Sequence, residues 1–228
     1  MFYYGYYSIF AMLPVIILGL IVQANLKNTY SVYSKKVNSL SCTGEQMANM
    51  ILRNAGITDV QVNCVAGNLS DHYNPATRTV NLSRAVFEGT SIASIGVAAH
   101  ECGHAIQHHE AYFPLRVRSA AVGITNFSSK LLYFLIIISL VLSSYSFSTV
   151  IFDLAILCYL VIFLFQLITL PVEFNASSRA LRVIDNAGYD AQDVKGIRKV
   201  LTAAALTYVS AAVTALWQLL IMLNRRKR

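Results

Sequence analysis

Residues 131–172 read LLYFLIIISLVLSSYSFSTVIFDLAILCYLVIFLFQLITLPV, and Asp153 is their one charged residue. On each side of Asp153 the apolar run is about 20 residues long, which is the length at which an α-helix crosses the hydrocarbon core of a bilayer. We therefore expect a hairpin of two transmembrane helices over residues 131–172. The two helices should be separated at Asp153, and Pro171 should introduce a kink or a boundary.

Two further uncharged runs cover residues 2–24 and 200–224. Each is long enough to span a bilayer, so about four transmembrane helices are expected. A cleaved signal peptide is the alternative for the first run, because residues 22–24 loosely resemble a cleavage site. The basic residues that precede the apolar part of a signal peptide are missing, which favours an uncleaved anchor.

The composition of the whole chain points the same way. Of its 228 residues 56% are hydrophobic and only 13% are charged, which excludes an ordinary soluble domain and a disordered chain. The net charge of +7 comes from basic residues that flank the apolar runs, so we expect a lipid bilayer and no nucleic acid as partner. The four cysteines form no CxxC pair, so no disulfide framework is expected. The chain is predicted to be a mainly α integral membrane protein.

Residues 25–130 have the composition of a small soluble domain. Within it, residues 43–56 begin with a T-x-x-Q capping box and continue with helical spacing of apolar residues. Residues 60–65 and 79–83 alternate with period two, which predicts a small β-ribbon. A helix capped by serine should follow over residues 91–109. The domain is therefore expected to be α+β.

His100, Glu101 and His104 form an H-E-x-x-H motif in that last helix. Two histidines four residues apart on a helix project from the same face, so both imidazoles can bind one Zn²⁺ ion. The glutamate between them can reach a water molecule at the metal. The alternative is a pair of partly buried, hydrogen-bonded histidines without a metal.

A catalytic zinc site needs a third protein ligand. His108 is close in sequence, but a straight helix places its Cα about 12 Å from that of His100, too far for easy closure on one ion. The metzincin pattern fails as well, because Gln107 and Glu110 occupy the positions of its glycine and third histidine. We expect His108 and His109 to be surface residues.

Glu173 is the better candidate for the third ligand, because it stands at the end of the third apolar run, where a carboxylate is costly. The predicted hairpin leaves its two ends on the same side of the membrane, so Glu173 can meet His100 and His104. An interfacial glutamate paired with Arg179 is the alternative, and the residues alone leave both open.

Five segments of the sequence form a recognisable set: Asp71-His72-Tyr73-Asn74-Pro75, Val80-Asn81-Leu82-Ser83, Ser91-Ile92-Ala93, residues 98–108 around the H-E-x-x-H motif, and Pro171-Val172-Glu173-Phe174-Asn175-Ala176-Ser177. With them the sequence resembles the bacterial YugP-type membrane zinc metallopeptidases over nearly the whole chain. The resemblance implies a zincin-like peptidase domain in a bacterial cell membrane. It also implies a gluzincin-like site with His100, His104 and Glu173 as ligands of one Zn²⁺ per chain and Glu101 as the catalytic carboxylate.

The sequence departs from the wider gluzincin pattern at one position. Many such enzymes have an aspartate four residues after the ligand glutamate, where it orients a zinc-bound histidine, and here that position is Ser177. Ser177 can accept a hydrogen bond but brings no charge, so it is one candidate for this role, and Asn175, Asp185 or a backbone carbonyl are the others. A donor to the developing oxyanion is also expected. The candidates for it are His72, Tyr73 and Arg179.

These residues predict a membrane-bound, zinc-dependent endopeptidase. Zn²⁺ would lower the pKa of a water molecule, and Glu101 would take its proton as general base and later protonate the leaving amine. An edge strand of the β-ribbon would hold an extended peptide. Because Glu173 stands at the end of a span, we expect membrane-proximal or unfolded proteins as substrates. Two other classes stay open: a membrane scaffold with a closed structural zinc site that includes His108 or Cys102, and a small transporter.

The expected organisation is a first transmembrane helix (1–24), a peptidase domain (25–130), a transmembrane hairpin (131–172), a segment with the third ligand (173–199), and a fourth transmembrane helix with a basic tail (200–228). Basic residues favour a cytoplasmic zinc site. Eleven of them flank the spans on that side: Lys27, Lys35, Lys36, Arg116, Arg118, Lys130, Arg179, Arg182, Lys195, Arg198 and Lys199. The four basic residues of the tail, 225–228, are the contrary evidence.

Overall fold

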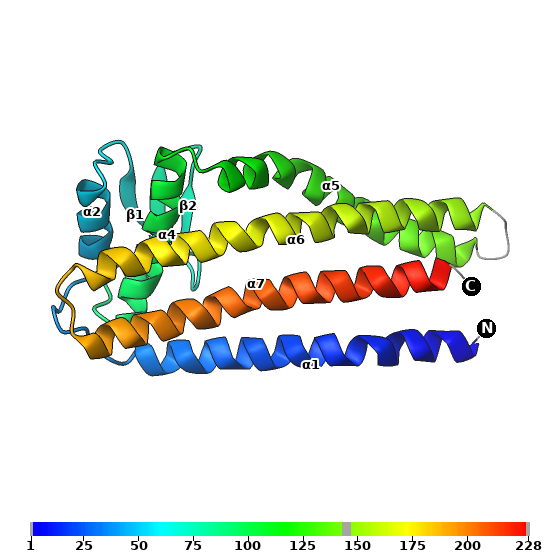
Figure 1. The fold of residues 1–228 in the computed structure, drawn as a ribbon, viewed down its shortest axis with the longest axis horizontal. Coiled ribbons are helices and arrows are strands. Elements are labelled where there is room, and N and C mark those ends of the chain that lie inside the picture. The colour runs from blue at the N-terminus through cyan, green and yellow to red at the C-terminus, as the bar shows by residue number, and fades with distance from the viewer. Residues whose placement is uncertain (1, 143–146, 227–228) are drawn as a thin grey trace. The chain divides into compact units, whose positions relative to one another are not determined.

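The computed structural model describes residues 2–142 and 147–226, with the backbone alone for residues 2–9. Four long helices account for most of this part of the chain: α1 (Phe2–Tyr33), α5 (Phe113–Val141), α6 (Ser148–Asp185) and α7 (Ala191–Arg226) (Figure 1). All four are long and apolar enough to cross a membrane. The predicted class is confirmed: the protein is a mainly α integral membrane protein with a small α+β region.

The predicted break at Asp153 is wrong. Asp153 lies inside α6, and the two helices of the hairpin end and begin at Val141 and Ser148. A single carboxylate does not interrupt a helix when it finds a partner, and Arg226 of α7 donates to both oxygens of Asp153. Of the basic tail, Lys227 and Arg228 lie outside the described residues.

Pro171 does not end the helix either. Helix α6 continues through it to Asp185, and α1 likewise contains Pro14. Proline removes one backbone donor, and long membrane helices tolerate this because neighbouring groups satisfy the freed carbonyl. The consequence is that Glu173 stands on a continuous helix rather than in a new segment.

The chain divides into two compact units. One contains residues 1–22, 117–170 and 208–228, and the other contains residues 23–116 and 171–207. All the candidate site residues belong to the second unit, which also contains the sheet and the short helices.

The sheet of the second unit has three strands in the order β1-β3-β2. Strands β1 (Gln61–Val65) and β3 (Thr79–Ser83) occur where strands were expected, but they pair in parallel rather than as a ribbon. The short β2 (His72–Asn74), which was not expected, pairs antiparallel with β3. Adjacent parallel strands need a long connecting segment. The segment between β1 and β3 provides this connection, and β2 lies within it.

Three helices complete this unit: α2 (Gly44–Asn54), α3 (Arg84–Phe87) and α4 (Ile92–His109). The predicted capping box of α2 is present, with the Gln46 backbone N–H donating to Thr43 and the Thr43 backbone N–H donating to Gln46. Ser91 caps α4 by accepting from the N–H of Ser94 at 3.0 Å. Both helices therefore begin within a residue of their predicted starts.

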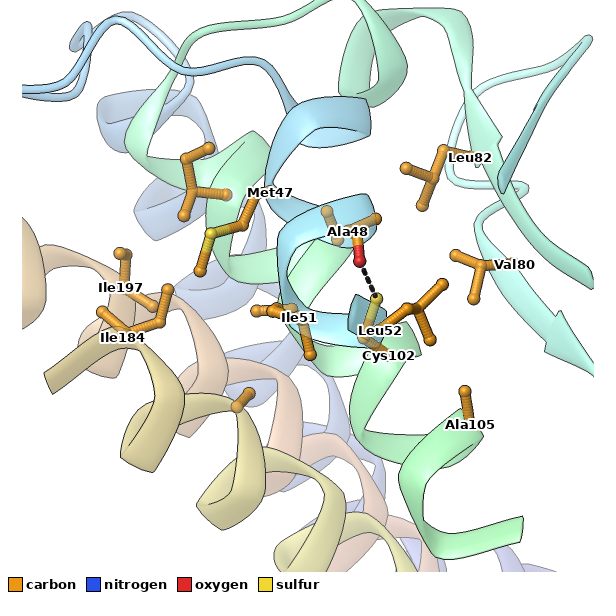
Figure 2. Packing of buried hydrophobic residues seen from close by; sticks show 14 of the residues in the cluster. Met47, Ala48, Ile51, Leu52, Val80, Leu82, Cys102, Ala105, Ile184 and Ile197 are labelled. Carbon is orange, nitrogen blue, oxygen red and sulfur yellow. Dashed lines mark hydrogen bonds between the residues drawn. The ribbon is translucent and has the colours of Figure 1, made fainter. Parts of the chain in front are cut away.

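A continuous apolar core joins α2, α4, β3, α6 and α7 within the second unit. In Figure 2, Met47 and Ile51 of α2 lie close to Ile184 and Ile197. The thiol of Cys102 in α4 donates to a backbone carbonyl of α2. Each fully buried aliphatic side chain of this kind stabilises the fold by about 1.5–3 kcal/mol. The core thus fixes one side of α4, and the H-E-x-x-H histidines project from another.

Candidate metal centre

His100 and His104 of α4 converge with Glu173 of α6, and one ligand atom from each residue lies within 4.8 Å of the other two. The Nε2 atoms of His100 and His104 are 3.2 Å and 3.5 Å from the same carboxylate oxygen, Oε2 of Glu173. The two imidazole rings are nearly perpendicular, at 83°. The geometry brings together three residues that the sequence analysis selected from distant parts of the chain.

These three groups fit a divalent cation. The Glu173 side chain is only 3% exposed, and a carboxylate so deeply buried needs compensation of its charge. Burial disfavours the charged form of His104, but its hydrogen bond to Glu173 raises the pKa of the imidazole overall. Because two imidazole nitrogens face one oxygen of this buried carboxylate, a cation among these atoms would compensate its charge. Two histidines and one carboxylate are a typical ligand set of catalytic zinc.

The second nitrogen of each histidine has a polar neighbour. Ser177 Oγ lies 3.2 Å from Nδ1 of His100, so serine occupies the place at which the wider pattern has an aspartate. Gln107 Oε1 lies 3.0 Å from Nδ1 of His104. Ser177 was among the residues expected to play this part, whereas Gln107 was not. The available signal was spacing, because a residue three positions after His104 shares its side of a helix.

Glu101 is held beside the short strand β2. Its Oε2 accepts a hydrogen bond from the backbone N–H of Tyr73 at 2.9 Å. The hydroxyl of Tyr73 is 2.8 Å from Nδ1 of His108, and burial raises the pKa of that phenol. His108, which was expected at the surface, is partly buried against Tyr73, whereas His109 is exposed as predicted. The cause is β2, which the sequence analysis did not predict.

The remaining candidates make hydrogen bonds and an ion pair outside the three-residue cluster. His72 is exposed, with Nδ1 2.7 Å from the carbonyl of Ser70. Arg179 donates to Asn175 at 2.7 Å and forms an ion pair with Glu110, also at 2.7 Å. The ion pair that the sequence analysis considered for Arg179 is therefore made with Glu110.

Close contact between α4 and α6 brings the ligands together. Gly103 lies next to the backbone of Ala176, and a Cβ at position 103 would be 2.5 Å from the carbonyl oxygen of Ala176. Glycine is the residue that permits this approach. It stands between the two histidines on α4, and Ala176 stands one turn after Glu173 on α6.

The chain matches the family described as "putative neutral zinc metallopeptidase" over residues 8–227. The chain belongs to this family. It is also 42% identical over 225 residues to the "putative membrane protease YugP" of Bacillus subtilis (strain 168), a match that covers 96% of this chain and 98% of the relative. No solved structure matches it significantly. Membership of a zinc metallopeptidase family supports a protease role and zinc as the metal.

The scaffold alternative requires a fourth protein ligand. Among the described residues of this chain, His100, His104 and Glu173 are the only three metal-binding side chains that lie together. The Cys102 thiol donates to the carbonyl of Ala48, 3.7 Å away in the core (Figure 2). Burial raises the pKa of that thiol, so it stays protonated. His108 contacts Tyr73. Neither residue joins the cluster, and a three-ligand site leaves a coordination position for water.

Proposed function

We propose that the protein is a membrane-bound, zinc-dependent endopeptidase with a gluzincin-like site. His100, His104 and Glu173 would hold one Zn²⁺ per chain, and Glu101 would act as general base. The observation that carries this proposal is the convergence of Glu173 with both histidines of the H-E-x-x-H helix. The contact between Glu101 and the Tyr73 backbone supports the role of that glutamate.

Zinc held by His100, His104 and Glu173 would supply positive charge, which acidifies a water molecule and polarises the scissile carbonyl. Glu101 takes the proton of the attacking water and later delivers it to the leaving amine. The Tyr73 N–H donates to Oε2 of Glu101 and so orients the carboxylate that takes the proton. Of the three candidates for an oxyanion donor we favour Tyr73, because its protonated phenol belongs to the residue that holds Glu101.

An extended peptide would bind along β2, which is an edge strand with β3 as its neighbour. Because Glu173 stands on the same helix as an apolar span, we expect substrates near the membrane surface. The test compares a soluble peptide with a lipid-anchored version of it, using protein in liposomes. Preferential cleavage of the anchored peptide is expected, and equal cleavage would contradict this part of the proposal.

We place the site on the cytoplasmic face of a bacterial cell membrane, because eleven basic residues flank the spans on its side. The pairing of Arg226 with Asp153 offsets part of the contrary charge in the tail. Cys64 is an exposed thiol in the same unit as the site. A membrane-impermeant maleimide should label it only after cells are permeabilised, with Cys64→Ser as control. Labelling of intact cells would place the site outside.

The decisive experiment is hydrolysis of casein by the detergent-purified protein, with wild type and Glu101→Gln compared after zinc loading. The Gln variant should retain zinc and lose activity by about 10²–10⁴-fold, the usual contribution of a general base. Equal activity of the two proteins would refute the role of Glu101. If both bind zinc and wild type cleaves neither casein nor the anchored peptide, the structural-zinc scaffold is the better description.

A further inference from the structure

Gln107 is the most completely buried polar side chain near the metal centre, with an exposed fraction of 0%. A buried amide is costly unless its donors and acceptor are satisfied. Its Nε2 donates to the carbonyl of Val172 at 2.8 Å and to Oδ1 of Asn175 at 2.9 Å. Its Oε1 contacts Nδ1 of His104. Gln107 therefore links the helix of the two histidines to the helix of Glu173.

The direction of these hydrogen bonds follows from Arg179. A guanidinium only donates, so the Asn175 atom that lies 2.7 Å from Arg179 Nε must be the amide oxygen. The same oxygen faces Gln107, so Gln107 must present its NH₂ group there. The carbonyl of Val172 also requires a donor from that NH₂ group. The orientation of the Gln107 amide is thus determined from two sides.

The consequence reaches His104. With its NH₂ group committed to α6, Gln107 presents its oxygen to His104, and an amide oxygen can only accept. His104 must therefore carry a proton on Nδ1. In the neutral imidazole the lone pair is then on Nε2, the atom that faces Glu173.

We infer that Arg179, Asn175 and Gln107 form a chain of hydrogen bonds with fixed donors and acceptors, and that this chain holds His104 in the tautomer able to bind zinc through Nε2. Gln107 is then a positioning residue of the metal site. The inference rests on the proposed function, from which it takes the metal. His100 differs, because its neighbour Ser177 is a hydroxyl that can either donate or accept.

The test is the zinc dissociation constant of the detergent-purified full chain, measured by competition with a chromophoric chelator. Gln107→Leu should weaken zinc binding by roughly 10–100-fold, as loss of such a partner usually does. The matched control is Gln192→Leu at an exposed position, which should leave the constant unchanged. Unchanged affinity in Gln107→Leu would overturn the inference. A Gln107→Leu variant that unfolds at a lower temperature without zinc but binds zinc normally would also overturn it, because a merely structural role of Gln107 gives that result.

A second pair of variants decides the matter if Gln107→Leu does not fold. Asn175→Asp keeps an acceptor oxygen for both Gln107 and Arg179, so it should bind zinc at least as tightly as wild type. Asn175→Leu removes the acceptor and should bind zinc more weakly. Equal affinities in the two variants would overturn the inference. A wild-type protein that takes up no zinc would instead refute the metal site, and with it the proposed function.

Discussion

Replacing Gly103 with alanine tests whether the close approach of α4 to α6 holds the metal site together. The added Cβ would lie 2.5 Å from the Ala176 carbonyl oxygen and 3.0 Å from its carbonyl carbon, whereas ordinary contacts begin at 3.4 Å. The atoms that the new Cβ would meet belong to the backbone of Ala176, so no side-chain rotation relieves the clash. The two helices must separate locally by about 0.9 Å, the difference between the clash and an ordinary contact.

This displacement is large for a metal centre, because functional groups must be held to within roughly 0.5 Å of their working positions. The histidines stand on α4 and Glu173 on α6, so the separation acts directly on the distances between the ligands. We expect zinc binding to weaken by at least about tenfold and hydrolysis to fall by about 10²-fold. Overpacking costs about 1–3 kcal/mol, partly offset by the better helix propensity of alanine.

The assay measures zinc affinity by chelator competition and casein hydrolysis at saturating zinc. Gly123→Ala is the matched control, because Gly123 is also inside a helix and a Cβ there has nothing within 4 Å. The control should match wild type in zinc affinity and activity. If Gly103→Ala behaves like Gly123→Ala in both measurements, the reasoning about helix contact is wrong.

Two further substitutions separate the groups around the site. Ser177→Ala should weaken zinc binding by roughly tenfold, because Nδ1 of His100 loses its partner. The control Ser178→Ala, at the exposed neighbouring position, should leave zinc binding unchanged. Zinc affinity is measured for both variants by chelator competition. Cys102→Ala should lower the free energy of unfolding by about 1–2 kcal/mol in thermal denaturation yet leave the zinc dissociation constant unchanged, because its thiol contacts Ala48 in the core. Loss of zinc from this variant would argue for a closed structural site.

Several features of the fold were predictable because they depend on residues within one or two turns of each other. The four apolar runs match the thickness of a bilayer, and the capping box at Thr43 marks the start of a helix. The spacing of His100 and His104 places both on one side of α4. Predictions failed where a residue has its partner far along the chain. The helix break expected at Asp153 is absent, and the charge of Asp153 is compensated by Arg226.

In the candidate site, too, the features that depend on nearby residues were predictable and those that depend on distant contacts were not. From the residues, Glu173 could be either a ligand or an interfacial carboxylate, and the family resemblance rather than spacing favoured the ligand. The parallel pairing of β1 with β3, the contact of Tyr73 with Glu101, and the bridge that Gln107 makes to α6 all join segments far apart along the chain. Hydropathy and periodicity indicate whether each segment is a membrane-spanning helix, an amphipathic helix or a strand. Which segments meet, and at what distance, depends on packing such as that of Gly103 against Ala176, where the absence of one Cβ sets how closely two helices approach.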